Sequence, residues 1–172
     1  MNKSFYFRKI QSRQDIEDIC QFISNNIVIK GDIYNPFFRL TTLNSLKECR
    51  EYVNNCLRSS FHDFYMIINK DDDRSIGFAF SYEFRMYDSN CKIFVWCQDE
   101  ITDEQLLLII DGFSKMLFTL YPIKKQYAEM LEECNTINLY KQSGFTIECV
   151  LKEYVYSNGG YHSLSILGKE RE

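Results

Sequence analysis

Hydrophobic residues recur along the chain with two periods, and the change from one period to the other predicts alternating strands and helices. Seven segments are typical of strands, because apolar and polar residues alternate or β-formers run between turn signals. These are residues 4–10, 61–69, 76–84, 92–98, 123–131, 145–156 and 161–168. Four segments have helical spacing or follow a capping residue. These are residues 12–26, 42–56, 102–120 and 135–143.

Capping residues predict where two of the helices begin. Ser12 is expected to cap the first helix, with Asp15 at its N3 position. Thr102 and Gln105 match the capping-box pattern at the start of the longest helix. That helix carries one apolar stripe that we expect to lie on the sheet: Leu106, Ile110, Phe113, Leu117 and Leu120.

The last predicted helix carries a single tyrosine, Tyr140. Asn135 is its expected N-cap, and Gly144 follows its end, where a left-handed residue favours glycine. A helix of about two turns is not stable alone, so we expect it to be packed between strands. The strands on either side of it would then hold Tyr140 in place.

The strand at residues 76–84 is predicted to have two different faces. One face is large and apolar: Ile76, Phe78, Phe80, Tyr82 and Phe84. The other is small and polar, so that another group can approach it closely: Gly77, Ala79, Ser81 and Glu83. The element order is therefore β-α-α-β-β-β-α-β-α-β-β, an α/β layered arrangement with a mixed sheet. We expect one domain over residues 1–172, since no repeat or linker interrupts the pattern.

Composition excludes several classes of protein. The net charge of −4 gives no basic field for nucleic acid, and the longest apolar run, 106–110, is too short for a membrane span. Seven cysteines without a CxxC pair, and no leader-like apolar stretch, favour a reduced cytoplasmic protein. With two histidines and a solvated turn at 71–73, no metal site is expected.

Three short phrases carry a family resemblance: IGFA at 76–79, LYKQSGF at 139–145 and NGGY at 158–161. Together with the element order, the chain resembles the GNAT superfamily of N-acetyltransferases, most closely its ribosomal-protein and small-amine branch. The resemblance implies a largely antiparallel mixed sheet of six to seven strands with about four helices. It also implies acetyl-CoA as co-substrate, bound between the strands that precede and follow the long helix.

Residue by residue, the resemblance implies a cofactor site at one end of that gap. The pyrophosphate would sit where the long helix begins, at Thr102 or Asp103, because helix N-termini bind anions. The full set of expected cofactor contacts is Trp96, Cys97, Gln98, Ile101, Thr102, Asp103, Asn135 and Lys141.

The resemblance also implies catalytic roles. Tyr140 would protonate the departing thiolate as general acid, although a core aromatic is an equally good interpretation of it. Glu83 is the best candidate for the general base, against a solvated charge at a strand end. The acceptor, a small-molecule amine or a peptide N-terminus, would be lined by aromatics that are otherwise core residues: Tyr34, Phe37, Phe38 and Tyr161. A homodimer is left open.

The chain departs from the family pattern at the phosphate loop. Glycines normally let the backbone approach phosphate, but 98–104 has none and carries four carboxylates. A carboxylate about 5 Å from a phosphate costs roughly 3 kcal/mol at an effective dielectric near 20. The usual asparagine seven residues before the tyrosine is replaced by Glu133. Two alternatives therefore stay open: a degenerate module that binds no CoA, and an enzyme that takes acyl groups from a carrier protein.

Overall fold

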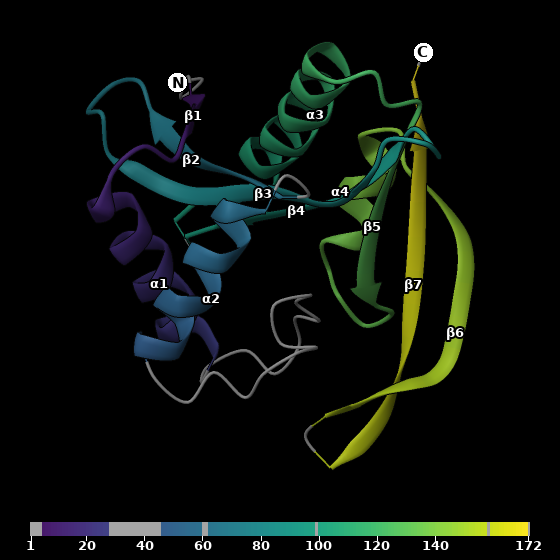
Figure 1. Cartoon of the computed structure of the whole chain (residues 1–172). Coiled ribbons are helices and arrows are strands. Elements are labelled where there is room, and N and C mark those ends of the chain that lie inside the picture. Colours follow the sequence, from purple (N-terminus) through teal and green to yellow (C-terminus); the bar gives the residue numbers. More distant parts are fainter. Residues whose placement is uncertain (1–4, 28–45, 60–61, 99, 158, 172) are drawn as a thin grey trace.

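A computed structural model of the chain describes residues 5–27, 46–59, 62–98, 100–157 and 159–171. Within them it contains seven strands and four helices (Figure 1). In chain order they are β1 (Phe5–Lys9), α1 (Arg13–Ile27), α2 (Leu46–Arg58), β2 (Asp63–Asn69), β3 (Ser75–Arg85), β4 (Asn90–Cys97), α3 (Asp103–Leu120), β5 (Lys125–Leu131), α4 (Ile137–Gln142), β6 (Thr146–Ser157) and β7 (Gly160–Glu170). The predicted succession of elements is confirmed.

The strands form one sheet in the order β1-β2-β3-β4-β5-β7-β6. Every neighbouring pair is antiparallel except β4 and β5, which are parallel and are joined through α3. The sheet is thus mixed and largely antiparallel, as expected. The predicted hairpin of the last two strands is also confirmed, with Ser157 paired to Gly160.

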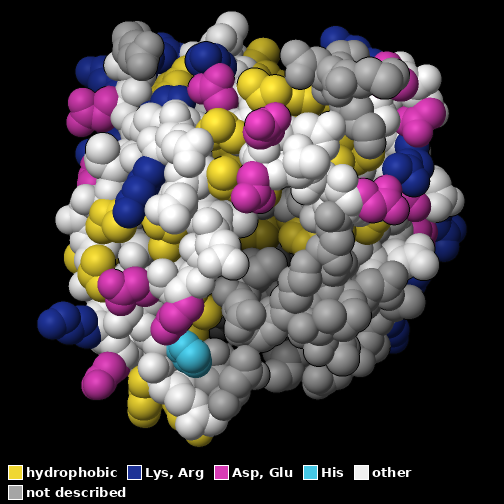
Figure 2. All heavy atoms as spheres, turned by 180° about the vertical axis from the view of Figure 1, so that it is seen from behind, with side chains coloured by type: hydrophobic (Ala, Val, Ile, Leu, Met, Phe, Trp, Pro, Cys, Tyr) yellow, Lys and Arg dark blue, Asp and Glu magenta, His cyan; other side chains and the backbone are white. Residues whose placement is uncertain are grey.

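Helices cover the sheet from both sides (Figure 1). The buried residues of α3 and α4 pack with one face in a cluster that includes Ile110, Phe113 and Tyr140. Those of α1 and α2 pack with the other face in a second cluster that includes Ile19 and Val53. No helix formed by the described residues is long and apolar enough to cross a membrane. Figure 2 shows acidic and basic side chains intermixed over the rear of the molecule.

Strand β3 follows the predicted alternation only in its middle. Phe78, Phe80 and Tyr82 pack beneath α1 and α2, as one apolar face should. Ile76 and Phe84 instead join the cluster beneath α3, so the prediction of a single face is wrong at both ends. The pairing register shifts near each end of the strand, and a bulge of this kind moves the following side chains to the opposite face.

The small residues of β3 let other parts of the protein approach the strand closely. A Cβ at Gly77 would collide with the carbonyl oxygen of Trp96 on β4. Ala79 and Ser81 are fully buried, and Ala79 belongs to the cluster beneath α3. The close approach that the small residues predict is therefore made by neighbouring backbone and by a helix.

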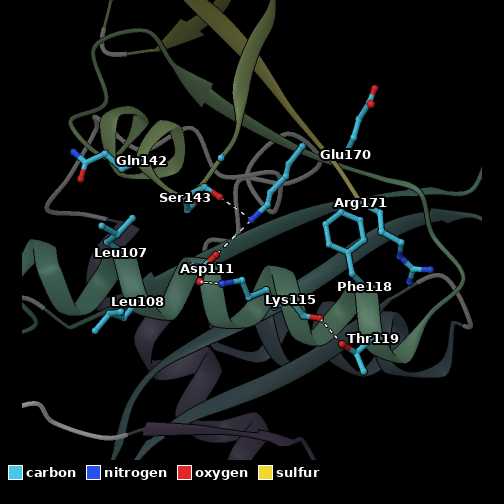
Figure 3. A pocket seen from close by; sticks show the side chains of 12 residues that line it. Leu107, Leu108, Asp111, Lys115, Phe118, Thr119, Gln142, Ser143, Glu170 and Arg171 are labelled. Atoms are coloured by element: carbon cyan, nitrogen blue, oxygen red, sulfur yellow. Dashed lines mark hydrogen bonds and ion pairs between the residues drawn. The ribbon is translucent and has the colours of Figure 1, made fainter.

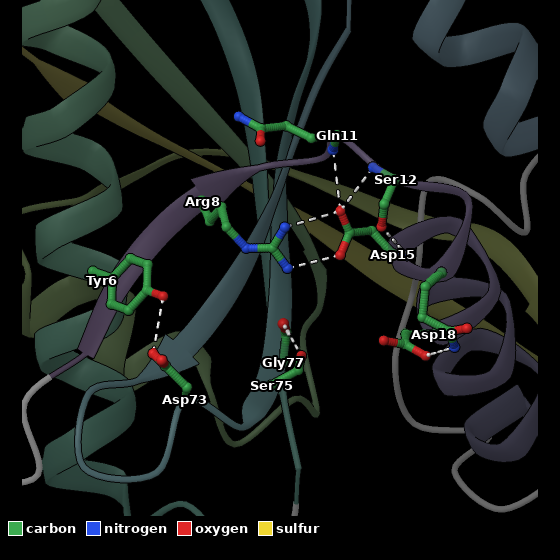
Figure 4. A network of polar contacts seen from close by, with 10 residues as sticks. Tyr6, Arg8, Gln11, Ser12, Asp15, Asp18, Asp73, Ser75 and Gly77 are labelled. Atoms are coloured by element: carbon green, nitrogen blue, oxygen red, sulfur yellow. Dashed lines mark hydrogen bonds and ion pairs between the residues drawn. The ribbon is translucent and has the colours of Figure 1, made fainter.

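The start of α1 is fixed by the predicted cap. Ser12 accepts a hydrogen bond from the Asp15 N–H, while the Asp15 carboxylate accepts the N–H groups of Gln11 and Ser12 (Figure 4). The Arg8 guanidinium donates to both oxygens of that carboxylate, at 2.7 and 3.1 Å. Burial by itself raises the pKa of Asp15, but these donors outweigh it and lower the pKa to about 2.

The capping box at Thr102 and Gln105 is also present, and α3 begins at Asp103. The predicted apolar stripe of α3 is confirmed for its central residues, which are buried, and is wrong for its first and last residues. Leu106 is only half-buried and Leu120 is 56% exposed. The buried residues of α3 are Ile109, Ile110, Phe113, Ser114 and Leu117.

The N-cap of α4 is Thr136, so the prediction of Asn135 is wrong by one residue. The Thr136 side chain makes no capping hydrogen bond. At the other end, Gly144 has φ +93°, which confirms the expected left-handed residue. The predicted start of α2 at residue 42 lies outside the described residues.

Replacing Asp15 by Asn should destabilise the fold in a pH-dependent way. The folded carboxyl has a pKa of about 2, against about 3.9 in an unfolded chain, so its stabilisation is present above pH 4 and is lost as the pH falls towards 2. We expect the substitution to lower the free energy of unfolding by about 2 kcal/mol at pH 7, and by about 1 kcal/mol less than that at pH 3. Urea unfolding at the two pH values measures it.

Asp18→Asn is the matched control, since Asp18 lies outside the cap and, among the described residues, accepts a hydrogen bond only from Gln14 one turn away. This control substitution should shift the urea midpoint of unfolding little at either pH. An Asp15→Asn effect of equal size at pH 7 and pH 3 would contradict the ionic origin of the cap.

Candidate active site

The sheet opens between β4 and β5. These two strands pair at only three positions, and the last pair is Lys92 with Tyr127. Beyond it, β4 stays paired with β3 as far as Cys97, and β5 stays paired with β7 as far as Leu131. Each strand follows its outer neighbour, so the inner edge of β4 from Ile93 onward has no strand partner among the residues that the structure describes. Main-chain donors and acceptors on that edge are available to another molecule.

Tyr140 on α4 points into this opening. Its side chain is only 2% exposed and packs edge-on against Phe145, with ring centroids 5.3 Å apart. The hydroxyl faces the main-chain N–H of Val95 on β4, but it makes no hydrogen bond of normal geometry with any described residue. Burial raises the pKa of this hydroxyl well above its usual value, so it stays protonated. A buried hydroxyl without a full partner is costly, and a ligand atom placed in the opening would satisfy it.

Two thiols lie around Tyr140. Cys97, at the end of β4, and Cys134, before α4, both pack against the cluster that contains Tyr140. Burial raises the pKa of Cys97 to about 12, so it is a protonated, unreactive thiol. The Cys134 sulfur lies 2.9 Å from the Thr136 hydroxyl. Both side chains are small and only weakly polar, so they add little bulk or charge beside Tyr140.

The loop from β4 into α3 uses most of its own donors. The Gln98 N–H donates to Ile76 on β3, and the Ile101 N–H donates back to Gln98. Thr102 and Gln105 satisfy each other in the capping box. The first turn of a helix has no internal acceptors, so the N–H groups of Asp103 and Glu104 remain for an external anion.

The described carboxylates of this loop are ion-paired or exposed to solvent. Glu100 is turned towards the residue that precedes β3, where it accepts from Arg74 at 3.1 Å. Asp103 and Glu104 are exposed to solvent. Asp99 lies outside the described residues. Solvent screening therefore weakens the repulsion that the sequence predicts at the anion site.

The remaining predicted cofactor contacts are scattered. Trp96 points to the opposite face of the sheet, where it packs against Phe22 and Phe78. Asn135 and Lys141 are exposed at the two ends of α4. Glu133, which stands at the family's asparagine position, pairs with His162 at 3.3 Å.

Glu83 is placed on the α1/α2 face by the β3 bulge, at φ +49°. It is 2.9 Å from the Lys92 ammonium, which also lies 2.9 Å from Glu129 on β5. The side chain of Glu129 is only 6% exposed, against 43% for Glu83. This network sits at the closed end of the opening, where β4 and β5 part, and Arg85 lies 3.9 Å from the Glu83 carboxylate on its outer side.

The predicted acceptor residues are placed only in part. Tyr161 is 68% exposed on the hairpin and packs edge-on against Tyr156. Tyr34, Phe37 and Phe38 lie outside the described residues.

Sequence reasoning missed the Val95 amide, Lys92 and Glu129. A main-chain donor has no signature in side-chain patterns, so Val95 could not be found from them. Glu129 did leave a signal, because it interrupts an otherwise apolar strand end, AEML at 128–131. A carboxylate in such a position is buried only when it is paired.

No protein-family model and no curated protein matches the chain. Solved structures do match it over nearly its whole length. One is the spermidine N-acetyltransferase of Vibrio cholerae in complex with CoA and spermine, with 18% identity and a TM-score of 0.82 over 96% of this chain and 95% of that one. Another is RimL, a ribosomal L7/L12 α-N-protein acetyltransferase in complex with coenzyme A, with 14% identity and a TM-score of 0.80 over 97% and 94%. The chain therefore has the fold of GNAT acetyltransferases, as its resemblance predicted.

The thiols should differ sharply in reactivity. Cys149 is exposed on β6, whereas Cys97 is held protonated at the opening. Iodoacetamide at pH 8 should modify Cys149 and leave Cys97 intact, because only thiolates react. Peptide mass mapping over time measures this, with urea-unfolded protein as the control in which both react. Equal rates for the two thiols in folded protein would contradict the described opening.

Proposed function

We propose that the protein is an acyl-CoA-dependent N-acyltransferase that moves an acetyl group from acetyl-CoA to an amine. One observation carries the proposal: the buried Tyr140 hydroxyl faces an unpaired strand edge at Val95 without a full hydrogen-bond partner. The matched structures support it, since both are named as acetyltransferases and both hold CoA.

Acetyl-CoA would supply the acyl group as a thioester. The free edge of β4 beyond Val95 would bind the amide groups of its arm as an added strand does. The N–H groups of Asp103 and Glu104 would receive the pyrophosphate at the start of α3. Gln98, Ile101 and Thr102 shape this turn, and Cys97 borders it from β4.

Tyr140 would serve as the general acid. Its hydroxyl is held protonated by burial, so a proton is available when a thiolate leaves beside it. Because the Val95 N–H faces the same hydroxyl, the sulfur would lie between two donors. Asn135 and Lys141 flank α4 and would contact the outer part of the cofactor.

The acceptor amine would enter from the α1/α2 face. Glu83 would act as the base, reaching the amine either directly or through water, while the shared Lys92 ammonium orients its carboxylate. The half-exposed Glu83 carboxylate suits an ammonium substrate, either a small amine or a peptide N-terminus. Tyr34, Phe37, Phe38 and Tyr161 would line the entrance.

A degenerate module that no longer binds CoA remains the formal alternative, but neither matched structure supports it. Calorimetry with acetyl-CoA separates the two. We expect saturable binding, and we expect Cys134→Trp to abolish it by filling the opening. Cys149→Trp, on exposed β6, is the matched control and should bind like the native protein. Absence of binding at millimolar acetyl-CoA to folded native protein would end the enzyme proposal.

Tyr140→Phe should keep acetyl-CoA binding and lose turnover. Removing a general acid lowers kcat by roughly 10²–10⁴-fold, while the ring packing against Phe145 survives. Thiol release measured with a panel of polyamines and short peptides gives the rate. A kcat within about twofold of native would show that Tyr140 only packs the core.

A further inference from the structure

A carboxylate flanks the opening between β4 and β5 close to the level of Tyr140. Glu129 lies on β5, two residues beyond Tyr127, where the pairing with β4 ends. Residues of parallel strands advance together from their last pair, so Glu129 lies level with Phe94 on β4 and one residue before Val95. The main-chain N–H of Val95 is the group that the Tyr140 hydroxyl faces. Glu129 therefore stands beside the part of the opening that Tyr140 reaches.

Two observations place Glu129 on the α1/α2 face of the sheet. Its neighbours on β5, Ala128 and Met130, pack in the cluster beneath α3, and successive residues of a strand point to opposite faces. Its carboxylate also lies 2.9 Å from the Lys92 ammonium, which sits over a tyrosine ring of the α1/α2 cluster. Tyr140 belongs to the cluster beneath α3. The opening thus has a carboxylate on one face and a protonated hydroxyl on the other.

Contacts outside the opening hold both groups in place. The Lys169 ammonium donates to the Ser143 carbonyl at 2.7 Å and so fixes the C-terminal end of α4, which carries Tyr140 (Figure 3). On the other face, Lys92 fixes Glu129. Burial by itself lowers the pKa of Lys92, but hydrogen bonds to its two carboxylate partners outweigh it and raise the pKa, so this side chain stays charged.

We propose that Glu129 binds the ammonium group of the acceptor and directs its nitrogen onto the thioester from the face opposite Tyr140. A carboxylate has about four acceptor positions, so Glu129 can accept from the amine while it accepts from Lys92. Fixed groups on the two faces orient the two reactants, which is a large part of what an enzyme contributes to a bimolecular step. The assignment rests on the proposed acyltransferase function and adds to it the group that positions the acceptor.

The protons and bonds of the step balance with these groups. The ammonium loses one proton to Glu83, which is half-exposed on the outer side of Lys92 and releases it to solvent. The nitrogen then bonds to the carbonyl carbon, the bond from carbon to sulfur breaks, and the Tyr140 proton goes to the sulfur. A second proton leaves the nitrogen as the amide forms, and it restores Tyr140.

Two unreactive thioethers of CoA test the role of Glu129 without a known acceptor. S-(2-aminoethyl)-CoA carries an ammonium tethered just beyond the sulfur, and S-(2-hydroxyethyl)-CoA carries a neutral hydroxyl at the same place. In calorimetry at pH 7 the native protein should bind the aminoethyl thioether about tenfold more tightly, because only this ligand makes a charge-assisted hydrogen bond to the carboxylate.

Glu129→Gln should remove this preference, since it keeps the shape of the side chain and an acceptor for Lys92 but loses the charge. Glu83→Gln should reduce the preference by less, because Glu83 lies beyond Lys92 on β3. Glu170→Gln is the matched control for loss of one negative charge, since Glu170 is exposed on β7, and it should keep the native preference. Thermal unfolding checks that each variant is folded.

The proposal is overturned if the native protein binds the two thioethers equally, or if folded Glu129→Gln keeps the preference. The native comparison is decisive even if that variant does not fold. Binding of both thioethers without a preference would leave the CoA site standing and remove only the role of Glu129. If neither thioether binds to the folded native protein, the acyltransferase proposal fails, and the role of Glu129 fails with it.

Discussion

The parting of β4 from β5 is the constraint on which the account of this molecule depends. Each strand is held on its outer side, β4 by β3 and β5 by β7, and those antiparallel pairs run almost the full length of the strands. The short parallel pairing between them ends at Lys92 and Tyr127. Main-chain groups beyond this point are left at the centre of the sheet, where they would otherwise be paired.

The rest of the fold stabilises the two walls of that opening. The bulges in β3 let the strand serve both helical layers, and the small side chain of Gly77 lets β4 lie close beside it. On the other wall, Lys169 of β7 donates to the C-terminal end of α4 and packs over Phe145. A helix of six residues would not be stable alone, so these contacts hold Tyr140 where it faces β4.

Local chemistry in the sequence was sufficient to predict the elements. Ser12 with Asp15 and Thr102 with Gln105 are hydrogen-bonded pairs only three residues apart. Such local pairs can be recognised in the sequence without knowing how the rest of the chain packs. The same reasoning missed the cap of α4 by one residue, because Thr136 makes no side-chain cap and leaves no pattern to find.

Long-range effects explain what the sequence could not predict. The β3 bulges arise from register with both neighbouring strands, so an alternating pattern within one strand cannot reveal them. They also decide that Glu83 meets Lys92 instead of facing α3. The role of Val95 depends on a main-chain N–H and on where β5 departs, neither of which is encoded in a side-chain motif.

The central claim is that the opening beside Tyr140 receives a CoA thioester along the edge of β4. Amide chemical shifts of ¹⁵N-labelled protein during an acetyl-CoA titration test it directly, since they report individual N–H groups. We expect saturating shifts at Val95, Asp103 and Glu104, with the outer β1 strand unchanged. Saturating shifts confined to residues away from β4 and the start of α3, or no shifts at millimolar acetyl-CoA, would contradict it.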